Sequence, residues 1–207
     1  MIKKIILLMI ISIGLICAKE SADDIIKKVQ KKYDNIENFY AEFVQKEIFT
    51  LTQTVNEIKG KLYIKNGVKY MVITEDQMIC TDGKTVWSYS KLSNQLLIDY
   101  FKKDKGSFLP KDLLFKYPKN CYAAILEENK TEWVLKLDPK DDSMGFIKTL
   151  KITVNKKDYV INKLEYTDFN DNDYVFEIVK IDLHTNIPDD LFTYKVKEGM
   201  DVVDLRL

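Results

Sequence analysis

Met78-Ile79-Cys80-Thr81-Asp82-Gly83-Lys84-Thr85-Val86-Trp87-Ser88-Tyr89 contains two short β-forming runs on either side of Asp82-Gly83. Asp-Gly is a strong signal for a two-residue hairpin turn, because both residues tolerate positive φ. Counting outward from this turn pairs Cys80 with Thr85 and Met78 with Trp87. Side-chain alternation then places a large apolar set on one face of the sheet and a smaller set, Ile79 and Val86, on the other. The larger set is Met78, Cys80, Trp87 and Tyr89. Both faces of this hairpin therefore need an apolar cover.

A second hairpin is predicted at Asn66-Gly67, which also favours a two-residue turn. Its expected register pairs Ile64 with Lys69, Leu62 with Met71 and Gly60 with Ile73. One face is then expected to carry Leu62, Ile64, Met71 and Ile73, and the other Tyr63, Tyr70 and Val72. This hairpin, too, is apolar on both faces.

The remaining patterns predict helices at two places and strands elsewhere. Ile25, Val29 and Tyr33 recur at helical spacing after a Ser21–Asp24 capping pair, so residues 22–36 are expected to form an amphipathic helix. A short second helix is expected within residues 107–118, opening at Pro110. Period-two segments are expected to form about ten or eleven strands in all. They include 39–45, 59–65, 68–74, 96–100, 122–127, 132–137, 149–154, 159–167 and 174–183, with 192–196 as the last candidate. So many strands in one small domain favour a mainly β fold, a strongly curved antiparallel sheet or barrel.

The N-terminus predicts export. Lys3 and Lys4 precede an apolar run of about a dozen residues, too short for an ordinary membrane span, and Cys17-Ala18 then leads into a polar segment. We interpret residues 1–18 as a signal peptide and residues 19–207 as a single domain. An uncleaved anchor and lipidation of Cys17 are the alternatives.

Charge and cysteine content narrow the classes of partner. The chain carries 32 basic and 32 acidic side chains, so nothing favours nucleic acid or a strongly anionic partner. In an oxidising compartment, Cys80 and Cys121 can form a disulfide; two buried thiols that never meet are the alternative.

No catalytic or metal-binding motif stands out. The one histidine, His184, is not accompanied by a Gly-x-Ser-x-Gly nucleophile motif, and no Cys or His spacing matches a zinc site. Residues 168–173 resemble a calcium loop only superficially, since Asp173 stands where the loop needs glycine. We therefore expect a protein that is not an enzyme and has no cofactor or metal. The surplus of apolar and aromatic residues predicts either a two-sided core or a cavity for an apolar ligand.

The chain contains an ordered series of short motifs: Phe39-x-Ala41-x-Phe43-x-Gln45, Gly60-x-Leu62-x-Ile64, Asp82-Gly83-Lys84-Thr85-Val86-Trp87-Ser88-Tyr89, Gln95-Leu-Leu-Ile98 and a closing pattern from Leu183 to Val202. In the order and spacing of these motifs, the chain as a whole resembles the periplasmic outer-membrane lipoprotein carrier family of the LolA type. The resemblance implies an open antiparallel β-barrel with an N-terminal helix and a short second helix as a lid.

The resemblance also implies a function. A monomeric periplasmic chaperone would bind the acyl chains of lipoproteins, receive them from an inner-membrane transporter and pass them to an outer-membrane acceptor. The residues expected to line the acyl cavity are Phe39, Phe43, Leu62, Ile64, Met71, Ile73, Met78, Trp87 and Tyr89. The lid would contribute Leu109, Leu113 and Leu114. For each of these residues, ordinary core packing is the alternative to ligand contact.

One position departs from the family. Asn66-Gly67 stands where the family commonly has Arg-Pro, whose arginine helps to hold the lid closed. Lys65 or Lys69 can replace that arginine only in part, because an ammonium group lacks the planar guanidinium fork. A sensor or adaptor of the same fold, which binds a partner protein or free lipid without transporting lipoproteins, is the alternative function.

Overall fold

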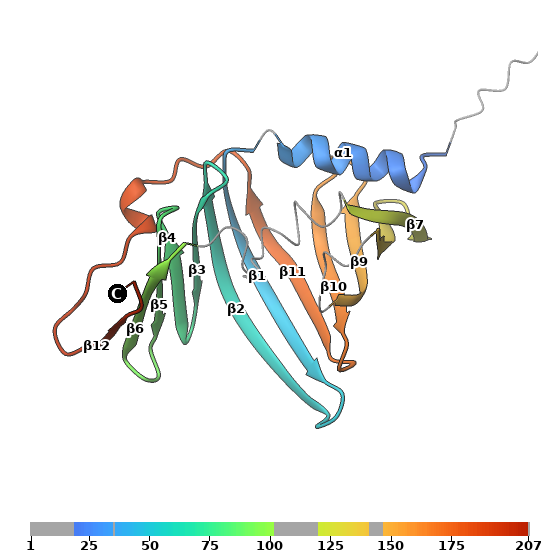
Figure 1. The fold of residues 1–207 in the computed structure, drawn as a ribbon. Helices are drawn as coiled ribbons and strands as arrows, with labels where there is room; N and C mark the ends of the chain where they lie inside the picture. The colour runs from blue at the N-terminus through green and yellow to red at the C-terminus, as the bar shows by residue number, and fades with distance from the viewer. Residues whose placement is uncertain (1–18, 35, 102–119, 141–146, 207) are drawn as a thin grey trace, which may run out of the picture.

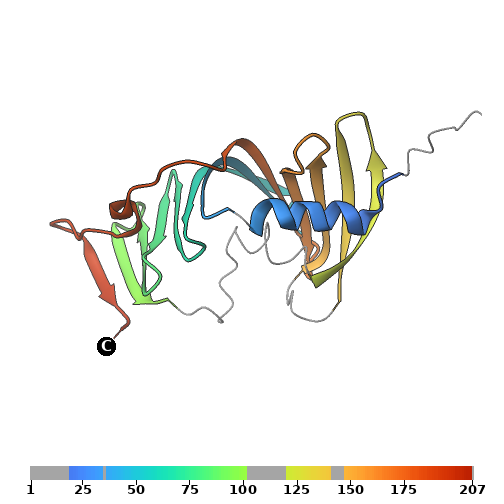
Figure 2. The same cartoon turned by 90° about the horizontal axis from the view of Figure 1, so that it is seen from above.

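A single curved sheet dominates the structure, and a helix lies across one end of it (Figures 1 and 2). The computed structural model describes residues 19–34, 36–101, 120–140 and 147–206. The expected signal peptide and the expected second helix, with Leu109, Leu113 and Leu114, lie outside these residues. No helix in the described part of the chain is long and apolar enough to cross a membrane.

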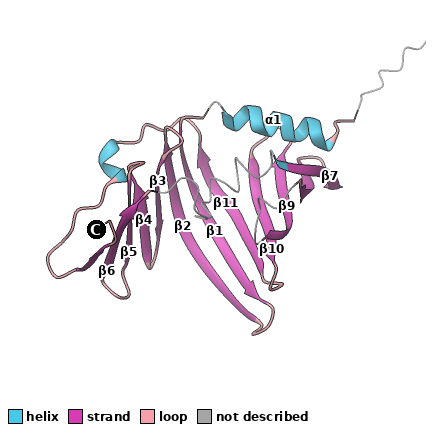
Figure 3. Ribbon diagram, viewed as in Figure 1, coloured by secondary structure: helices cyan, strands magenta, loops and turns pink. Residues whose placement is uncertain are grey.

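Twelve strands make up the described sheet, coloured magenta in Figure 3. Their order is β12-β6-β5-β4-β3-β2-β1-β11-β10-β9-β8-β7, and all neighbours are antiparallel except β12 and β6, which are parallel. This confirms the mainly β, open and strongly curved fold. The strands are β1 (Asn38–Phe49), β2 (Thr54–Lys65), β3 (Lys69–Thr74), β4 (Gln77–Thr81), β5 (Thr85–Ser90), β6 (Gln95–Tyr100), β7 (Cys121–Glu128), β8 (Glu132–Pro139), β9 (Ile147–Asn155), β10 (Ile161–Asp168), β11 (Asp173–Asp182) and β12 (Asp201–Asp204).

Helix α1 (Ala22–Asp34) ends two residues before the predicted boundary. The backbone N–H of Asp24 donates to Ser21 Oγ at 3.2 Å, which is the N-cap bond that the sequence predicts, and Ser21 Oγ itself donates to the Asp24 carboxylate at 2.7 Å. On the buried side, the Tyr33 hydroxyl accepts a hydrogen bond from Ile161 N at 3.0 Å. This bond and the buried Ile25, Ile26 and Val29 fix the helix on the sheet. We call the face under α1 the inner face.

The Asp82 hairpin forms, but its register differs from the prediction by two residues. The closest pair is Thr81 with Val86, because the Asp82 carboxylate accepts the backbone N–H groups of both Lys84 and Thr85 at 2.8 Å and widens the loop. A shift of two keeps every side chain on its face. Cys80 lies opposite Trp87 and Met78 opposite Tyr89, which confirms that these four side chains share one face.

At Asn66-Gly67 the predicted register is wrong by one residue. Lys65 pairs with Lys69, so the loop has three residues, and Asn66 and Gly67 both adopt positive φ, at 52° and 66°. A shift of one turns the second strand over. Leu62 and Ile64 therefore share the inner face with Tyr70 and Val72, whereas Met71 and Ile73 point to the opposite, outer face.

The C-terminal segment covers the outer face of β3–β5. Phe192 and Ile187 are buried there with Met71 and Cys80, and the ring of Tyr194 stacks on that of Tyr89 at 5.4 Å between centroids. The predicted strand at 192–196 is wrong: Phe192 closes the short 3₁₀ helix η4 (Asp189–Phe192), and the last strand is β12. The sheet is thus apolar on both sides here because a distant segment packs on the outer one.

Candidate functional site

The inner face carries the larger of the two buried apolar clusters. Beneath α1 it is closed by fully buried side chains, including Phe39, Leu135 and Leu164. Beyond them lie half-buried apolar residues of β3, β4 and β11: Val72, Ile79, Phe176, Ile178 and Ile181. The inner face therefore combines a buried apolar floor with side chains that solvent still reaches.

A row of aromatic rings crosses this face from β1 to β10. Phe43 and Phe176 lie 6.3 Å apart between ring centroids, Phe176 and Tyr166 lie 6.4 Å apart, and Tyr166 stacks on Tyr174 at 4.6 Å. Phe43 also lies over Gly60, where an added Cβ would come within 2.4 Å of its ring. Gly60 thus gives the Phe43 ring its place, and the row forms a continuous apolar wall.

The structure does not bring the nine predicted cavity residues together. Phe39, Phe43, Leu62 and Ile64 lie on the inner face. Met71, Ile73, Met78, Trp87 and Tyr89 lie on the outer face, where the C-terminal segment covers them. Only the first four can share a site under α1.

Sequence reasoning missed the contribution of β10 and β11. Tyr166, Tyr174, Phe176 and Ile178 were predicted to lie in strands but were not assigned to a site. The available signal was their alternation with residues such as Glu165, Thr167 and Glu177, which Val175 interrupts. The bulge at Val179 ends this alternation beyond Ile178, because the extra residue sits between the partners of Glu42 and Phe43 and changes the phase of the strand.

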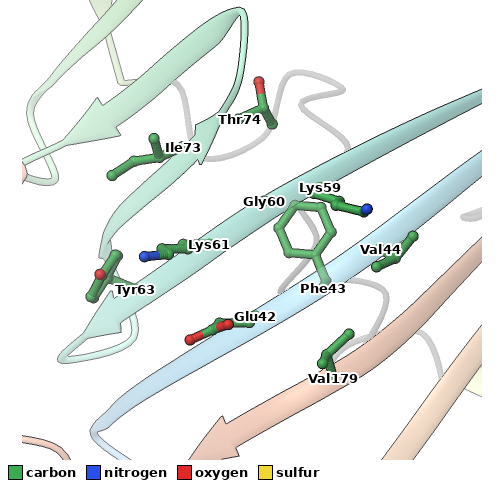
Figure 4. Close-up of a pocket in the computed structure, with 10 residues that line it drawn as sticks. All are labelled: Glu42, Phe43, Val44, Lys59, Gly60, Lys61, Tyr63, Ile73, Thr74 and Val179. Atoms are coloured by element: carbon green, nitrogen blue, oxygen red, sulfur yellow. The ribbon is translucent and has the colours of Figure 1, made fainter.

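A hollow of about 540 Å³ lies over β1, β2, β3 and β11 (Figure 4). Most of its side chains stand at outer-face positions, among them Glu42, Val44, Lys61 and Val179. Charged groups of both signs, Glu42, Lys59 and Lys61, stand beside apolar side chains in its lining.

Lys65 and Lys69, the two candidates for the family's arginine, both bind the C-terminal segment. Lys65 Nζ donates to the Ile187 carbonyl at 2.7 Å and lies 3.3 Å from the Asp189 carboxylate. Lys69 Nζ donates to the same carboxylate at 2.7 Å. The hydrogen bonds from Lys69 and Lys65 lower the pKa of Asp189 below its ordinary value. These two lysines thus fasten residues 187–189 to the β2–β3 hairpin.

The two cysteines that the structure describes, Cys80 and Cys121, are both buried, and no disulfide joins them. Cys80 belongs to the cluster on the outer face and Cys121 to the core on the inner face. The sheet itself separates them.

Burial raises the pKa of Cys80 to about 12, with a smaller contribution from the Asp82 charge. A protonated, buried thiol is a poor nucleophile. We expect iodoacetamide at pH 8 to leave Cys80 and Cys121 unmodified in the folded protein and to alkylate both in urea, as measured by intact-mass spectrometry. A Cys80–Cys121 bond in protein purified without reductant, or fast labelling of Cys80 in the folded state, would contradict this assignment.

The remaining polar candidates are His184 and the turn at residues 168–173, and neither forms a catalytic arrangement. His184 is exposed, and the described residues contain no group of His, Cys, Asp or Glu side chains that could hold a metal ion. In the β10–β11 turn, the Asp168 carboxylate accepts the backbone N–H groups of Asn170 and Asn172 at 2.8 and 2.9 Å. This is the polar hairpin turn that the sequence favours over a calcium loop.

Comparison with known proteins agrees with this architecture. The family described as "Outer membrane lipoprotein carrier protein LolA" matches residues 34–195. An outer-membrane lipoprotein carrier protein of Cronobacter sakazakii is 25% identical over 182 residues, with 86% of each chain covered. An uncharacterised protein of Methanocaldococcus jannaschii is 25% identical over 188 residues, which are 86% of this chain; the match spans only 52% of that relative.

A solved structure supports the fold. The crystal structure of an uncharacterised conserved protein from Thermus thermophilus superposes with a TM-score of 0.57 at 16% identity, covering 89% of this chain and 99% of that one. At this identity the likeness concerns the fold alone. The family match over most of the sequence confirms the resemblance of the motifs: the chain belongs to the outer membrane lipoprotein carrier protein LolA family.

Proposed function

We propose that the protein is a periplasmic chaperone that binds the acyl chains of lipoproteins on its inner face and carries them from the inner to the outer membrane. The observation that carries the proposal is the half-buried apolar set Val72, Ile79, Phe176 and Ile178 beside the aromatic row. Membership of the family, and relatives named as lipoprotein carriers, support the choice of cargo.

The energetics of alkyl chains require transfer by direct contact. Each CH₂ group removed from water is worth about 0.8 kcal/mol, so two or three long chains cannot leave the protein through water at a useful rate. An inner-membrane transporter must deliver the chains and an outer-membrane acceptor must take them, each while touching the carrier.

Contact with the cargo is assigned first to the residues that solvent reaches. Phe39, Leu62 and Ile64 are exposed by only 1–4%. They can touch an acyl chain only if the residues that cover them move aside, whereas Phe176 and Ile178 need no such movement. Phe43, 6% exposed, connects the two groups through its ring contact with Phe176.

Two adjacent residues of β11 provide a matched test. Ile178 lies on the inner face opposite Phe43, whereas Val179 is the bulged residue, 66% exposed and part of the outer hollow. We expect Ile178→Asp to weaken binding of a fluorescent fatty-acyl probe by about tenfold or more, because a carboxylate replaces an apolar contact. Val179→Asp should bind like the parent protein.

Circular dichroism spectra should show that both variants are folded. The same pair should then be tested for release of an acylated lipoprotein from inner-membrane vesicles. Equal probe binding and equal release by the two folded variants would exclude the inner face as the acyl site. Normal lipoprotein sorting in cells depleted of the protein would instead favour an adaptor.

A further inference from the structure

A basic groove of about 440 Å³ runs beside α1, apart from the inner face. Its walls are the exposed side of the helix, the turn between β9 and β10, and the residues that directly follow β11. The cationic side chains on its rim are Lys28, Lys31, Lys32 and, when protonated, His184.

Three lysines and one carboxylate, Asp158, belong to the lining of the groove, and Asp158 Oδ1 accepts the backbone N–H of Val160 at 3.2 Å. The nearby Asp182 carboxylate accepts the backbone N–H of His184 at 3.0 Å. Lys28 pairs with Glu20 and donates to the Tyr159 hydroxyl, but Lys32 makes no ion pair with any residue that the structure describes. The groove therefore favours an anion.

The floor of the groove is apolar. Ile36 and Leu183 line it, and both also pack against the core beneath α1. Tyr159 adds an aromatic wall that is held in place by stacking on Trp133 at 5.8 Å between ring centroids. A small hydrated anion would leave this floor uncovered, whereas a molecule that joins an anion to an alkyl chain would contact both parts.

We propose that this groove binds the headgroup phosphate of an anionic phospholipid. The phosphate lies among Lys31, Lys32 and His184, and the first methylene groups of the lipid lie on Ile36 and Leu183. The site is separate from the acyl-binding face and does not depend on lipoprotein transport. It gives the protein a means of recognising an anionic membrane surface or of holding one of its lipids.

The single histidine of the chain provides the probe. We expect short-chain dihexanoyl phosphatidylglycerol, added below its micelle concentration at fixed pH and salt, to shift the His184 imidazole resonances in a saturable way. Lys32→Glu should weaken this binding by about tenfold or more. Lys27→Glu is the matched control: Lys27 is on the same helix but does not line the groove, and it lies 3.8 Å from Asp24. It should bind like the parent protein.

Two further ligands identify the source of the anion. Inorganic phosphate alone and dihexanoyl phosphatidylcholine should each produce much smaller shifts than phosphatidylglycerol. An equal response to inorganic phosphate would overturn the lipid assignment, and an equal response to phosphatidylcholine would overturn the role of net charge. Absence of a saturable shift, or equal loss of binding in folded Lys32→Glu and Lys27→Glu proteins, would overturn the site itself.

Discussion

Replacing Phe192 with alanine is expected to lower the free energy of unfolding by about 3–5 kcal/mol. Phe192 is completely buried at the centre of the outer-face cluster, in contact with the side of the sheet that carries Met71 and Cys80. Its removal leaves a ring-sized cavity between the C-terminal segment and the sheet. Neither surface can close that cavity easily, because the pairing of β12 with β6 and the lysine contacts at Asp189 hold the segment on both sides.

Phe169→Ala is the matched control. Phe169 is 66% exposed in the β10–β11 turn, so its loss should change stability by no more than about 0.5 kcal/mol. Urea unfolding followed by circular dichroism gives both values. Similar midpoints for the two variants would show that the C-terminal segment does not contribute to the folded core.

Ile64→Asp is expected to prevent folding or to cost more than about 4 kcal/mol, the range reached when an unpaired charge is buried. Ile64 is 4% exposed on the inner face, between Phe39 of β1 and Tyr70 of β3. The change therefore cannot serve as a simple test of acyl binding in a folded protein. If Ile64 instead lined an open site, the protein would tolerate the carboxylate. The stability of this variant therefore distinguishes a buried core residue from a residue that contacts ligand.

Val55→Asp provides the comparison on the same strand. Val55 is 60% exposed at the start of β2, next to the β1–β2 turn. The Val55→Asp variant should retain the circular dichroism spectrum and unfolding midpoint of the parent protein. A cooperatively folded Ile64→Asp protein of parental stability would mean that the inner face is open at Ile64.

The period-two alternation of apolar and polar residues predicted the strands well, because this alternation depends only on local backbone geometry. Registers depended on loop lengths that dipeptide rules do not determine. At Asp82 the extra hydrogen bonds of the carboxylate moved the register by two, which changed no face. At Asn66 the loop gained one residue, and that single step moved Met71 and Ile73 to the other side of the sheet.

The candidate site was predicted only in part for a related reason. Large apolar residues on both faces of β3–β5 indicate that both faces are covered. They do not identify the segment or ligand that covers each face. The cover of the outer face begins at Ile187, about a hundred residues further along the chain. No pattern near Trp87 can therefore distinguish a ligand cavity from a docking surface for the chain's own C-terminus.

The position of this cover in the sequence imposes an order on biosynthesis. Residues 187–206 leave the ribosome after strands β1–β11, so Met71, Cys80 and Trp87 are still uncovered when the strands that carry them have been synthesised. A nascent chain, or one cut by a protease before Ile187, presents an apolar patch next to strand β6, which then lacks its partner β12. Such a surface favours binding by holding chaperones or aggregation, and the synthesis and docking of residues 187–206 remove it.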